Sequence, residues 1–163
     1  MRQQQSAYPP PMVKVIIFGA TGFVGGQVLK TAVVDNRISS IVVLSRKALA
    51  TTDLTNHPKV NVIIRSNFEE YPEEILGRLR GAVAVIWCIG GMVRDFDSVA
   101  TARRVQADLA RSTAETFVEA GILPLRFVFC SGAFAERDQN KKLWFLVDTR
   151  KIKVSTLHIL PRY

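Results

Sequence analysis

The feature that most constrains this chain is a glycine-rich turn that directly follows an apolar run. Residues 13–18 read VKVIIF, a β-branched segment of the kind that forms a strand buried on both faces. The next residues read GATGFVGG, in which Gly19, Gly22 and Gly25 are spaced G-x-x-G-x-x-G. Such glycines permit a tight turn, close approach of a diphosphate to the backbone, and close packing of the next helix. The pattern predicts a strand, a diphosphate-binding turn and a helix over residues 22–33.

The rest of the chain alternates strand-like and helical segments, which is typical of stacked βαβ units. Helical spacing and capping residues predict helices over 71–80 and from 97 or 98 to 120. Right-handed crossovers then give a doubly wound α/β Rossmann fold. Its mainly parallel sheet has five to six strands in the order 3-2-1-4-5, with helices on both faces. The further predicted strands are 40–45, 60–65, 82–90 and 126–131, with 155–160 as a candidate sixth.

Length and composition indicate one domain. The 163 residues are enough for one sizeable core. Residues 1–11, MRQQQSAYPPP, are expected to be a disordered proline-rich tail, and residues 12–163 to form the domain. The longest apolar run, 82–89, is far shorter than the roughly 20 residues of a membrane span. Because the tail lacks the apolar core of a secretory signal, and two cysteines make neither a disulfide framework nor a metal site, a cytoplasmic location is expected.

The charge balance is strongly basic, at +8, but its distribution argues against a nucleic-acid partner. Basic residues are scattered along the chain, with one enrichment over residues 137–162 and no repeated aromatic platform beside it. A pocket for a phosphorylated cofactor needs only a few of these charges. We therefore expect a dinucleotide partner and no nucleic acid.

The residues after the second predicted strand indicate which dinucleotide fits. Ser45, Arg46 and Lys47 stand there, with no carboxylate before Asp53. A site that prefers NAD places an acidic side chain at this point to bind the ribose hydroxyls. A guanidinium fork, an ammonium and a hydroxyl instead suit a 2′-phosphate. The sequence predicts NADP(H), with NAD(H) as the weaker candidate and a solvated basic loop as the alternative.

Two further turns complete the predicted cofactor site. Asn67, next to Phe68, can hydrogen-bond the adenine edge, although asparagine is also a routine turn residue. After the fourth predicted strand, Ile89 is followed by Gly90 and Gly91, which leave room for the inner ribose and the diphosphate. A loop that needs positive φ would explain these glycines equally well.

These segments together resemble the atypical short-chain dehydrogenases/reductases, and among them small fungal NAD(P)-binding proteins. The resemblance extends from Met12 to about Lys153 and rests on GATGFVG, LSRK after the second strand, CIGG after the fourth and FVFCSG at the fifth. It implies that Arg46 meets the 2′-phosphate and that Asn67 stands near the adenine. It also implies that the diphosphate is lined by Gly19, Thr21, Gly22, Phe23 and Val24.

In active members of that family a tyrosine transfers the proton, and a lysine four residues later lowers the pKa of its phenol. A serine orients the substrate carbonyl. The resemblance assigns the serine to Ser131 and the lysine to Lys153, which leaves Thr149 at the tyrosine position. The pKa of a threonine hydroxyl is far too high for the same acid role at pH 7.

Three functions therefore stay open. The chain is an NADP(H)-dependent oxidoreductase in which substrate or water replaces the tyrosine, a catalytically inactive NADP(H)-binding domain that senses cofactor or docks on a partner, or an incomplete fragment. The resemblance implies that the helix after Lys153 and the C-terminal substrate-binding part are absent. Residues 136–144 are expected to form a flexible loop over the site. Exposed Trp144 and Phe145 leave a homo-oligomer open, and the sequence indicates no particular substrate.

Overall fold

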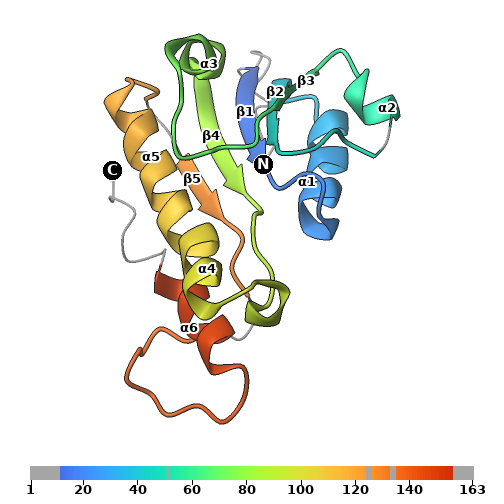
Figure 1. Ribbon diagram of the computed structural model, residues 1–163. Coiled ribbons are helices and arrows are strands. Elements are labelled where there is room, and N and C mark those ends of the chain that lie inside the picture. Colours follow the sequence, from blue (N-terminus) through green and yellow to red (C-terminus); the bar gives the residue numbers. More distant parts are fainter. Residues whose placement is uncertain (1–11, 51, 124–125, 133–134, 156–163) are drawn as a thin grey trace, which may run out of the picture.

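Five parallel strands form the centre of the protein (Figure 1). The computed structural model describes residues 12–50, 52–123, 126–132 and 135–155. The sheet order is β3-β2-β1-β4-β5, and every neighbouring pair is parallel. This confirms the predicted fold class and strand order. The strands are β1 (Val13–Phe18), β2 (Ile38–Ser45), β3 (Val60–Ile64), β4 (Ala82–Trp87) and β5 (Arg126–Phe129).

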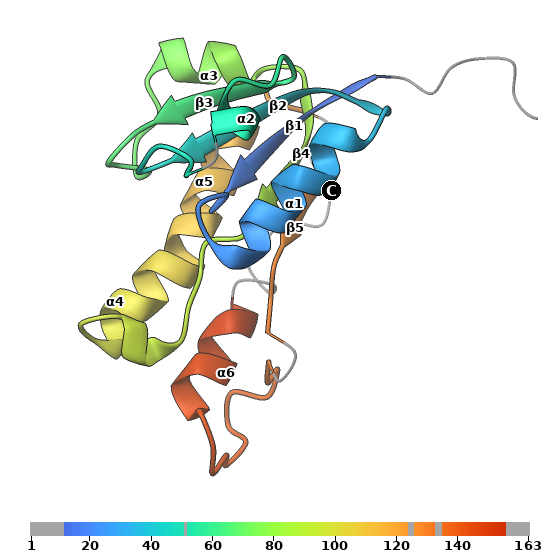
Figure 2. The ribbon, with the colours of Figure 1, turned by 90° about the vertical axis from the view of Figure 1, so that its right-hand side faces the viewer.

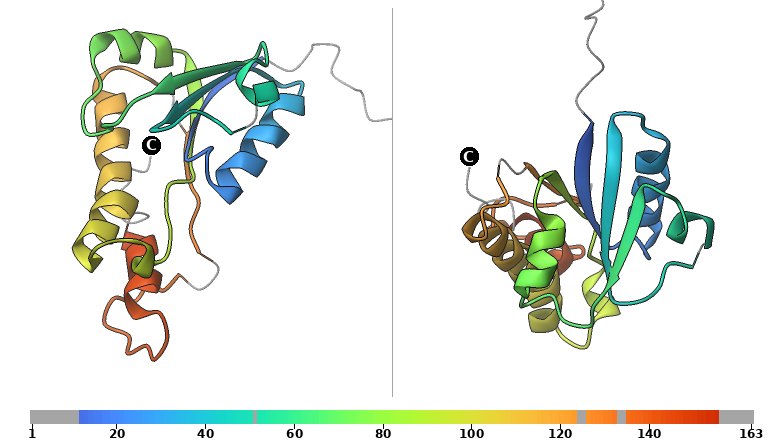
Figure 3. Two further views of the ribbon diagram at one scale, coloured as in Figure 1. Left: turned by 45° about the vertical axis from the view of Figure 1, so that its right-hand side comes forward. Right: turned by 90° about the horizontal axis from the view of Figure 1, so that it is seen from above.

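Helices cover both faces of the sheet. Helices α1 and α2 lie on one face, whereas α3, α4 and α5 lie on the other (Figures 2 and 3). Helix α6 lies beyond the carboxyl ends of the strands. The helices are α1 (Phe23–Val34), α2 (Thr52–Thr55), α3 (Glu73–Leu79), α4 (Val99–Arg103), α5 (Leu109–Glu119) and α6 (Val147–Ser155), with a 3₁₀ turn η1 (Val93–Asp95) and a π-helical segment η2 (Arg104–Asp108).

Two apolar cores flank β1, because successive side chains of a strand point to opposite faces of the sheet. Val15 and Ile17 join the core under α1, whereas Ile16 and Phe18 join the core under α3 and α5. The ring of Phe18 lies 4.5 Å from that of Trp87 and 5.6 Å from that of Phe68. Burial of such a side chain contributes about 1.5–3 kcal/mol to stability. The carboxyl ends of β1 and β4 are therefore fixed by a packed aromatic core.

The long helix before β5 differs from the prediction. Ser98 caps it, as one of the two predicted capping residues, and its hydroxyl accepts a hydrogen bond from the Thr101 N–H at 3.0 Å. The predicted helix to about residue 120 is present as α4, η2 and α5, but residues 104–108 within it form the π-helical segment η2. Within that segment the buried Gln106 accepts a hydrogen bond at its Oε1 from the Gly91 N–H at 3.0 Å. The helix is thereby tied to the loop after β4.

The C-terminal part of the described chain holds an element that the sequence did not predict, helix α6. Ile152 is buried against Ala102 and Ala107, so α6 packs on α4 and η2. Residues 136–144 carry neither helix nor strand, as expected, and the Glu136 N–H donates to the Arg150 carbonyl at 3.0 Å.

Two predicted segments fall wholly or largely outside the described residues. The tail 1–11 lies outside them, as do residues 156–160 of the candidate sixth strand. Ser155, the first residue of that candidate, is instead the last residue of α6.

Candidate functional site

The glycine turn between β1 and α1 is closed so tightly that two of its glycines cannot be replaced without a shift of backbone. Gly19 has φ +77°, and a Cβ there would lie 2.6 Å from the carbonyl carbon of Cys88. A Cβ on Gly25 would lie 2.1 Å from the carbonyl oxygen of Gly19. At Gly22 a Cβ would meet only that oxygen, at 3.4 Å. Gly19 and Gly25 thus serve packing. At Gly22 the N–H donates to the Gly19 carbonyl at 3.0 Å and the carbonyl accepts from the Gly26 N–H at 2.8 Å, so the turn is closed by backbone hydrogen bonds.

The N-terminus of α1 is suited to an anion. Gly22 is its N-cap, has no side-chain capping bond, and is followed by a first turn without acidic residues. The first N–H groups of a helix have no acceptor within the helix and lie at the positive end of its dipole. The side chain of Phe23 is 86% exposed and that of Val24 47%. A ligand at this helix end would therefore contact the backbone N–H groups. A diphosphate is a suitable acceptor for them.

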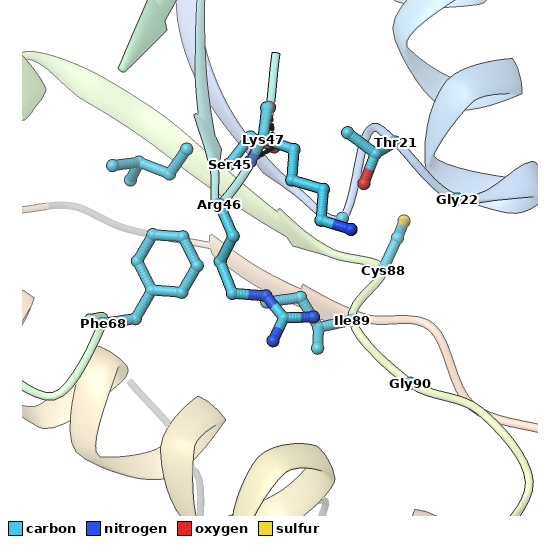
Figure 4. A pocket seen from close by; sticks show the side chains of 11 residues that line it. Thr21, Gly22, Ser45, Arg46, Lys47, Phe68, Cys88, Ile89 and Gly90 are labelled. Carbon is cyan, nitrogen blue, oxygen red and sulfur yellow. Dashed lines mark hydrogen bonds between the residues drawn. The ribbon is translucent and has the colours of Figure 1, made fainter. Parts of the chain in front are cut away.

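A cavity of about 220 Å³ opens beside this turn (Figure 4). Its charged lining side chains are Arg46 and Lys47, and no carboxylate lines it. The lining contains nine of the residues predicted to bind cofactor, together with Leu44 and Cys88, which the sequence analysis missed. The predicted nine are Gly19, Thr21, Gly22, Ser45, Arg46, Lys47, Phe68, Ile89 and Gly90.

The turn that carries Arg46 and Lys47 after β2 is stabilised by the side chain of Ser45. Ser45 is buried, and its hydroxyl donates to the Lys47 carbonyl at 2.6 Å and accepts from the Lys47 N–H at 3.2 Å. Figure 4 shows the Arg46 side chain running between Phe68 and Ile89, and that of Lys47 running toward Thr21. Within the described part of the chain, no ion pair engages either cation. Both cations therefore belong to the lining of the cavity without a described carboxylate partner.

A second cavity, of about 390 Å³, adjoins the first and shares Arg46, Phe68 and Ile89 with it. Asn67 lines this second space, and its Oδ1 accepts a hydrogen bond from the Glu69 N–H at 2.8 Å. The side-chain oxygen therefore has the routine turn role that the sequence left open. Glu69 is ion-paired with Arg104, so its carboxylate is neutralised by the chain itself.

The loop after β4 borders the cavity through Cys88, Ile89 and Gly90. Neither Gly90 nor Gly91 has a positive φ, so the explanation of these glycines by backbone conformation is wrong. Burial, and after it the neighbouring Cys130 thiol, raises the pKa of Cys88 to about 11. Cys88 is therefore a neutral thiol at pH 7 and adds no charge to the lining.

Of the three residues that the resemblance assigns to catalysis, one follows β5 and two lie on α6. Ser131 is half-buried and comes directly after Cys130. Thr149 lies on α6, and its Oγ1 accepts a hydrogen bond from the Val93 N–H at 3.0 Å. Lys153 follows one turn later on α6, and its side chain lies outside the described part. Neither Ser131 nor Thr149 lines the two cavities.

Other kinds of site find little support in the described residues. Their histidine, cysteine and acidic side chains form no group of three that could hold a metal ion. Among the same residues, no helix has both the length and the apolar character needed to cross a membrane. Tyr71, one of the few tyrosines, is buried, and its hydroxyl is hydrogen-bonded to that of Thr113 at 2.9 Å. Burial raises the pKa of Tyr71, as expected for a phenol in the core.

Comparison with solved structures supports the fold. A short-chain dehydrogenase/reductase from Burkholderia vietnamiensis superposes with a TM-score of 0.68 at 15% identity, over 91% of this chain and 77% of that one. At this level of identity the likeness concerns the fold alone.

Comparison of sequences adds relatives from fungi. The chain is 35% identical over 75 residues to leucinostatins biosynthesis cluster protein T of Purpureocillium lilacinum, which covers 46% of this chain and 27% of that protein. It is 24% identical over 141 residues to the mitochondrial protein FMP52 of Debaryomyces hansenii, over 86% of this chain and 58% of that protein. The matched regions thus span less than two thirds of either relative.

The match to a protein family covers most of the chain. Residues 19–155 match a family described as NAD(P)H-binding. They begin at the first glycine of the turn and include the loops after β2, β3 and β4, which border the two cavities. The family match confirms the NAD(P)-binding part of the resemblance, and the superposition confirms the Rossmann fold. The chain is a member of the NAD(P)H-binding family.

Proposed function

We propose that the chain binds NADP(H), in preference to NAD(H), at the carboxyl ends of β1, β2 and β4. One observation carries this proposal. The uncapped helix N-terminus at Gly22 and the cations of Arg46 and Lys47 border a single cavity whose lining has no carboxylate. A helix N-terminus suits a diphosphate, and a guanidinium fork suits a 2′-phosphate. An NAD site would need an acidic side chain after β2, where the chain has Arg46.

In this proposal the backbone and the loops divide the work of binding. The N–H groups at the start of α1, from Phe23 to Gly25, hold the diphosphate. Arg46 and Lys47 hold the 2′-phosphate. Asn67, Phe68 and Ile89 border the adenine end, while Gly90 leaves space at the inner ribose. A bound nicotinamide would supply or accept a hydride.

Chemistry beyond binding depends on a proton donor, and Thr149 is a poor one. Its hydroxyl already accepts a hydrogen bond from the Val93 N–H, and this bond connects α6 to the turn η1. The pKa of an aliphatic hydroxyl also lies far above that of a phenol. This observation favours the second candidate function, a dinucleotide-binding domain without a reaction of its own that senses cofactor or docks on a partner. An oxidoreductase would need Ser131 and Lys153 to act with a proton from substrate or water.

Calorimetric titration of the purified chain with NADPH and with NADH tests the binding proposal. We expect NADPH to bind about tenfold or more tightly, because a charge-assisted fork on a phosphate contributes about 1.5–3 kcal/mol. Equal affinities would remove the assignment of Arg46 to the 2′-phosphate. Failure of a folded chain to bind either dinucleotide would remove the whole cofactor site, and circular dichroism of the same sample shows whether the chain is folded.

The choice between the two functions has its own test, Thr149→Tyr. If Ser131 and Lys153 stand as the resemblance implies, the new phenol supplies the missing acid, and NADPH oxidation with a panel of carbonyl substrates appears above the wild-type rate. General acid catalysis contributes about 10²–10⁴-fold where it is well placed. Thr149→Phe is the matched control, since it has the ring without the hydroxyl. Equal rates in the two variants would support the binding domain.

A cytoplasmic location is part of the same proposal. The relative from Debaryomyces hansenii is named as mitochondrial, which makes that compartment the alternative for this chain. Fluorescence microscopy of the chain tagged at its C-terminus separates the two, because a mitochondrial stain would coincide with the tag in the second case only.

A further inference from the structure

The two cysteines of this chain stand at matching positions on neighbouring strands. β4 and β5 pair in parallel register, with Trp87 opposite Phe129, and Cys88 and Cys130 are the next residues on each side. The Cys130 N–H donates to the Trp87 carbonyl at 2.9 Å, so the ladder continues beyond the strands. Neighbouring strands lie about 4.8 Å apart. A disulfide spans a Cα separation of about 4.4–6.8 Å.

Register also places both side chains on the same face of the sheet, and the Cys130 thiol is close enough to help raise the pKa of Cys88. Both cysteines are reduced and half-buried. The backbone on the Cys88 side is fixed, because its N–H donates to the Phe18 carbonyl at 3.1 Å. Formation of a bond between the sulfurs therefore requires rotation of side chains and little movement of backbone.

The position of the pair relative to the cofactor cavity gives it a possible consequence for binding. Cys88 lines the cavity beside Gly19 and Thr21. A dinucleotide in that cavity would cover Cys88 and restrict access of small reagents to it. Neither cysteine is needed for the binding of NADP(H) proposed above, so the pair has no assigned role there.

We propose that Cys88 and Cys130 form a dithiol site that closes to an intrachain disulfide with oxidants of the peroxide class, and that a bound dinucleotide shields it. The second clause rests on the proposed function. In the reaction, a peroxide oxygen is transferred to one sulfur, which gives a sulfenic acid and one water. The other sulfur then attacks it, the S–O bond breaks, the S–S bond forms, and a second water leaves. Two electrons and two protons pass from the thiols to the peroxide.

The neutral thiol of Cys88 has a kinetic consequence. A thiol reacts with peroxide as its thiolate, and burial disfavours that form at Cys88. Closure is therefore slow at pH 7 and speeds up at higher pH, unlike the reaction of an exposed catalytic thiolate.

The first experiment needs no cofactor. The reduced full chain is treated with hydrogen peroxide and its intact mass and cross-linked peptides are measured. We expect the loss of two hydrogen atoms and one linked peptide pair containing Cys88 and Cys130. Cys88→Ser and Cys130→Ser are the matched controls, and each should gain oxygen or form a linked dimer instead. Separate oxygen adducts on both cysteines of the wild type, or an unchanged mass, would overturn the proposal.

A trivalent arsenical gives an independent measurement of sulfur proximity. Phenylarsine oxide binds two neighbouring thiols in one adduct, so the wild-type chain should retain one equivalent through desalting, and either serine variant should retain none. Retention by a single variant, or none by the wild type, would show that the sulfurs do not act as a pair.

Shielding is tested by the rate of disulfide formation with NADP⁺ present, since the oxidised cofactor does not consume peroxide. At ten times the dissociation constant measured by calorimetry, the rate should fall about tenfold, because the free fraction of the chain falls by that factor. Binding without slowing would overturn the shielding clause. No binding at all would overturn the proposed function instead, and the mass measurement on the cofactor-free chain would still decide the dithiol.

Discussion

The two ends of the described chain are organised in different ways. The turn between β1 and α1 is held by backbone against backbone, with Gly19 and Gly25 in contact and the last four residues of β1, Val15 to Phe18, buried. The segment from Glu136 to Ser155 is held by a few side chains, chiefly Ile152 in the core and Thr149 on the Val93 N–H. The part proposed to bind cofactor is thus rigid, while the part that would supply chemistry depends on few contacts.

That difference separates binding from catalysis in physical terms. Diphosphate recognition by backbone N–H groups depends on local geometry, which a buried strand and three glycines maintain. Proton transfer depends on a side chain within about 3 Å of the reacting atom. Trp144, next to α6, is 94% exposed, which shows how little of this segment packs on the rest of the protein. Four substitutions or titrations test this contrast.

Gly22→Asp should have the largest effect on binding. A carboxylate at the N-cap would face the diphosphate, and like charges about 4 Å apart near a protein surface repel by about 4 kcal/mol. The dissociation constant for NADPH should rise by about a hundredfold or more in calorimetry. Stability should be kept, because aspartate is a favourable N-cap and only one atom lies near the new Cβ. Gly26→Ala, inside α1, is the control and should bind normally.

Gly22→Asp with wild-type affinity would show that the turn does not face the ligand. A large loss of thermal stability in this variant would instead show that Gly22, like Gly25, serves packing. Both quantities are therefore measured on the same preparation, by calorimetry and by thermal melting.

Arg46→Glu should reverse the preference between the dinucleotides. The new carboxylate repels the 2′-phosphate and can accept hydrogen bonds from the ribose hydroxyls of NADH. We expect the affinity for NADPH to fall about 10- to 100-fold, while that for NADH rises or stays constant. Lys142→Glu, on the exposed loop before α6, makes the same change of net charge and is the control. A similar fall in both variants would mean that the effect is long-range attraction and not a contact.

Thr149→Val should act on the other region, through stability. The half-buried Val93 N–H loses its acceptor, and a buried donor without a partner costs about 1–3 kcal/mol. The midpoint of urea unfolding should fall accordingly, and proteolysis of the loop 136–144 should become faster. Thr149→Ser keeps the hydroxyl and should keep the stability. Equal midpoints for the valine and serine variants would show that this bond does not hold α6.

The smallest effect is a dependence on pH around Glu136. A hydrogen bond from Lys141, followed by the Asp138 N–H, lowers the pKa of Glu136 below its ordinary value of 4.5. Since the folded pKa is lower than the unfolded one, this carboxylate stabilises the fold above pH 4.5. That contribution is lost as the pH falls through the folded pKa. Wild type should melt slightly higher than Glu136→Gln at pH 7, and this difference should shrink as the pH falls below 4.5; a constant difference would contradict this.

The same contrast between local and long-range contacts explains which features could be predicted from the sequence. Gly19, Gly22 and Gly25 were informative because glycine spacing reports a local backbone requirement. The strand order followed from alternating elements and the handedness of crossovers. The placement of Arg46 beside the turn needed only the rule that parallel strands end at the same edge. Leu44 and Cys88 were missed, although Cys88 follows β4 where Gly19 follows β1, and that correspondence was the available signal.

What the sequence did not predict depends on contacts between distant residues. The π-helical segment forms around Gln106, whose side chain bonds to Gly91 on another loop. A hydrogen bond of this kind leaves no periodic pattern in the sequence from which it could be predicted. Helix α6 has few apolar residues, and Ile152 becomes buried only where α4 and η2 lie beneath it. The catalytic role of Thr149 and Lys153 stays a prediction for the same reason.

The central place of β1 in the sheet has a consequence for synthesis. β1 pairs with β2 soon after both leave the ribosome, but its other edge pairs with β4, whose last residue, Trp87, follows Phe18 by 69 positions (87 − 18). At about 5–20 residues per second, that edge waits several seconds for its partner. During that time an apolar strand exposes unpaired N–H and C=O groups along one edge. We therefore expect the nascent chain to be most prone to aggregation before β4 emerges.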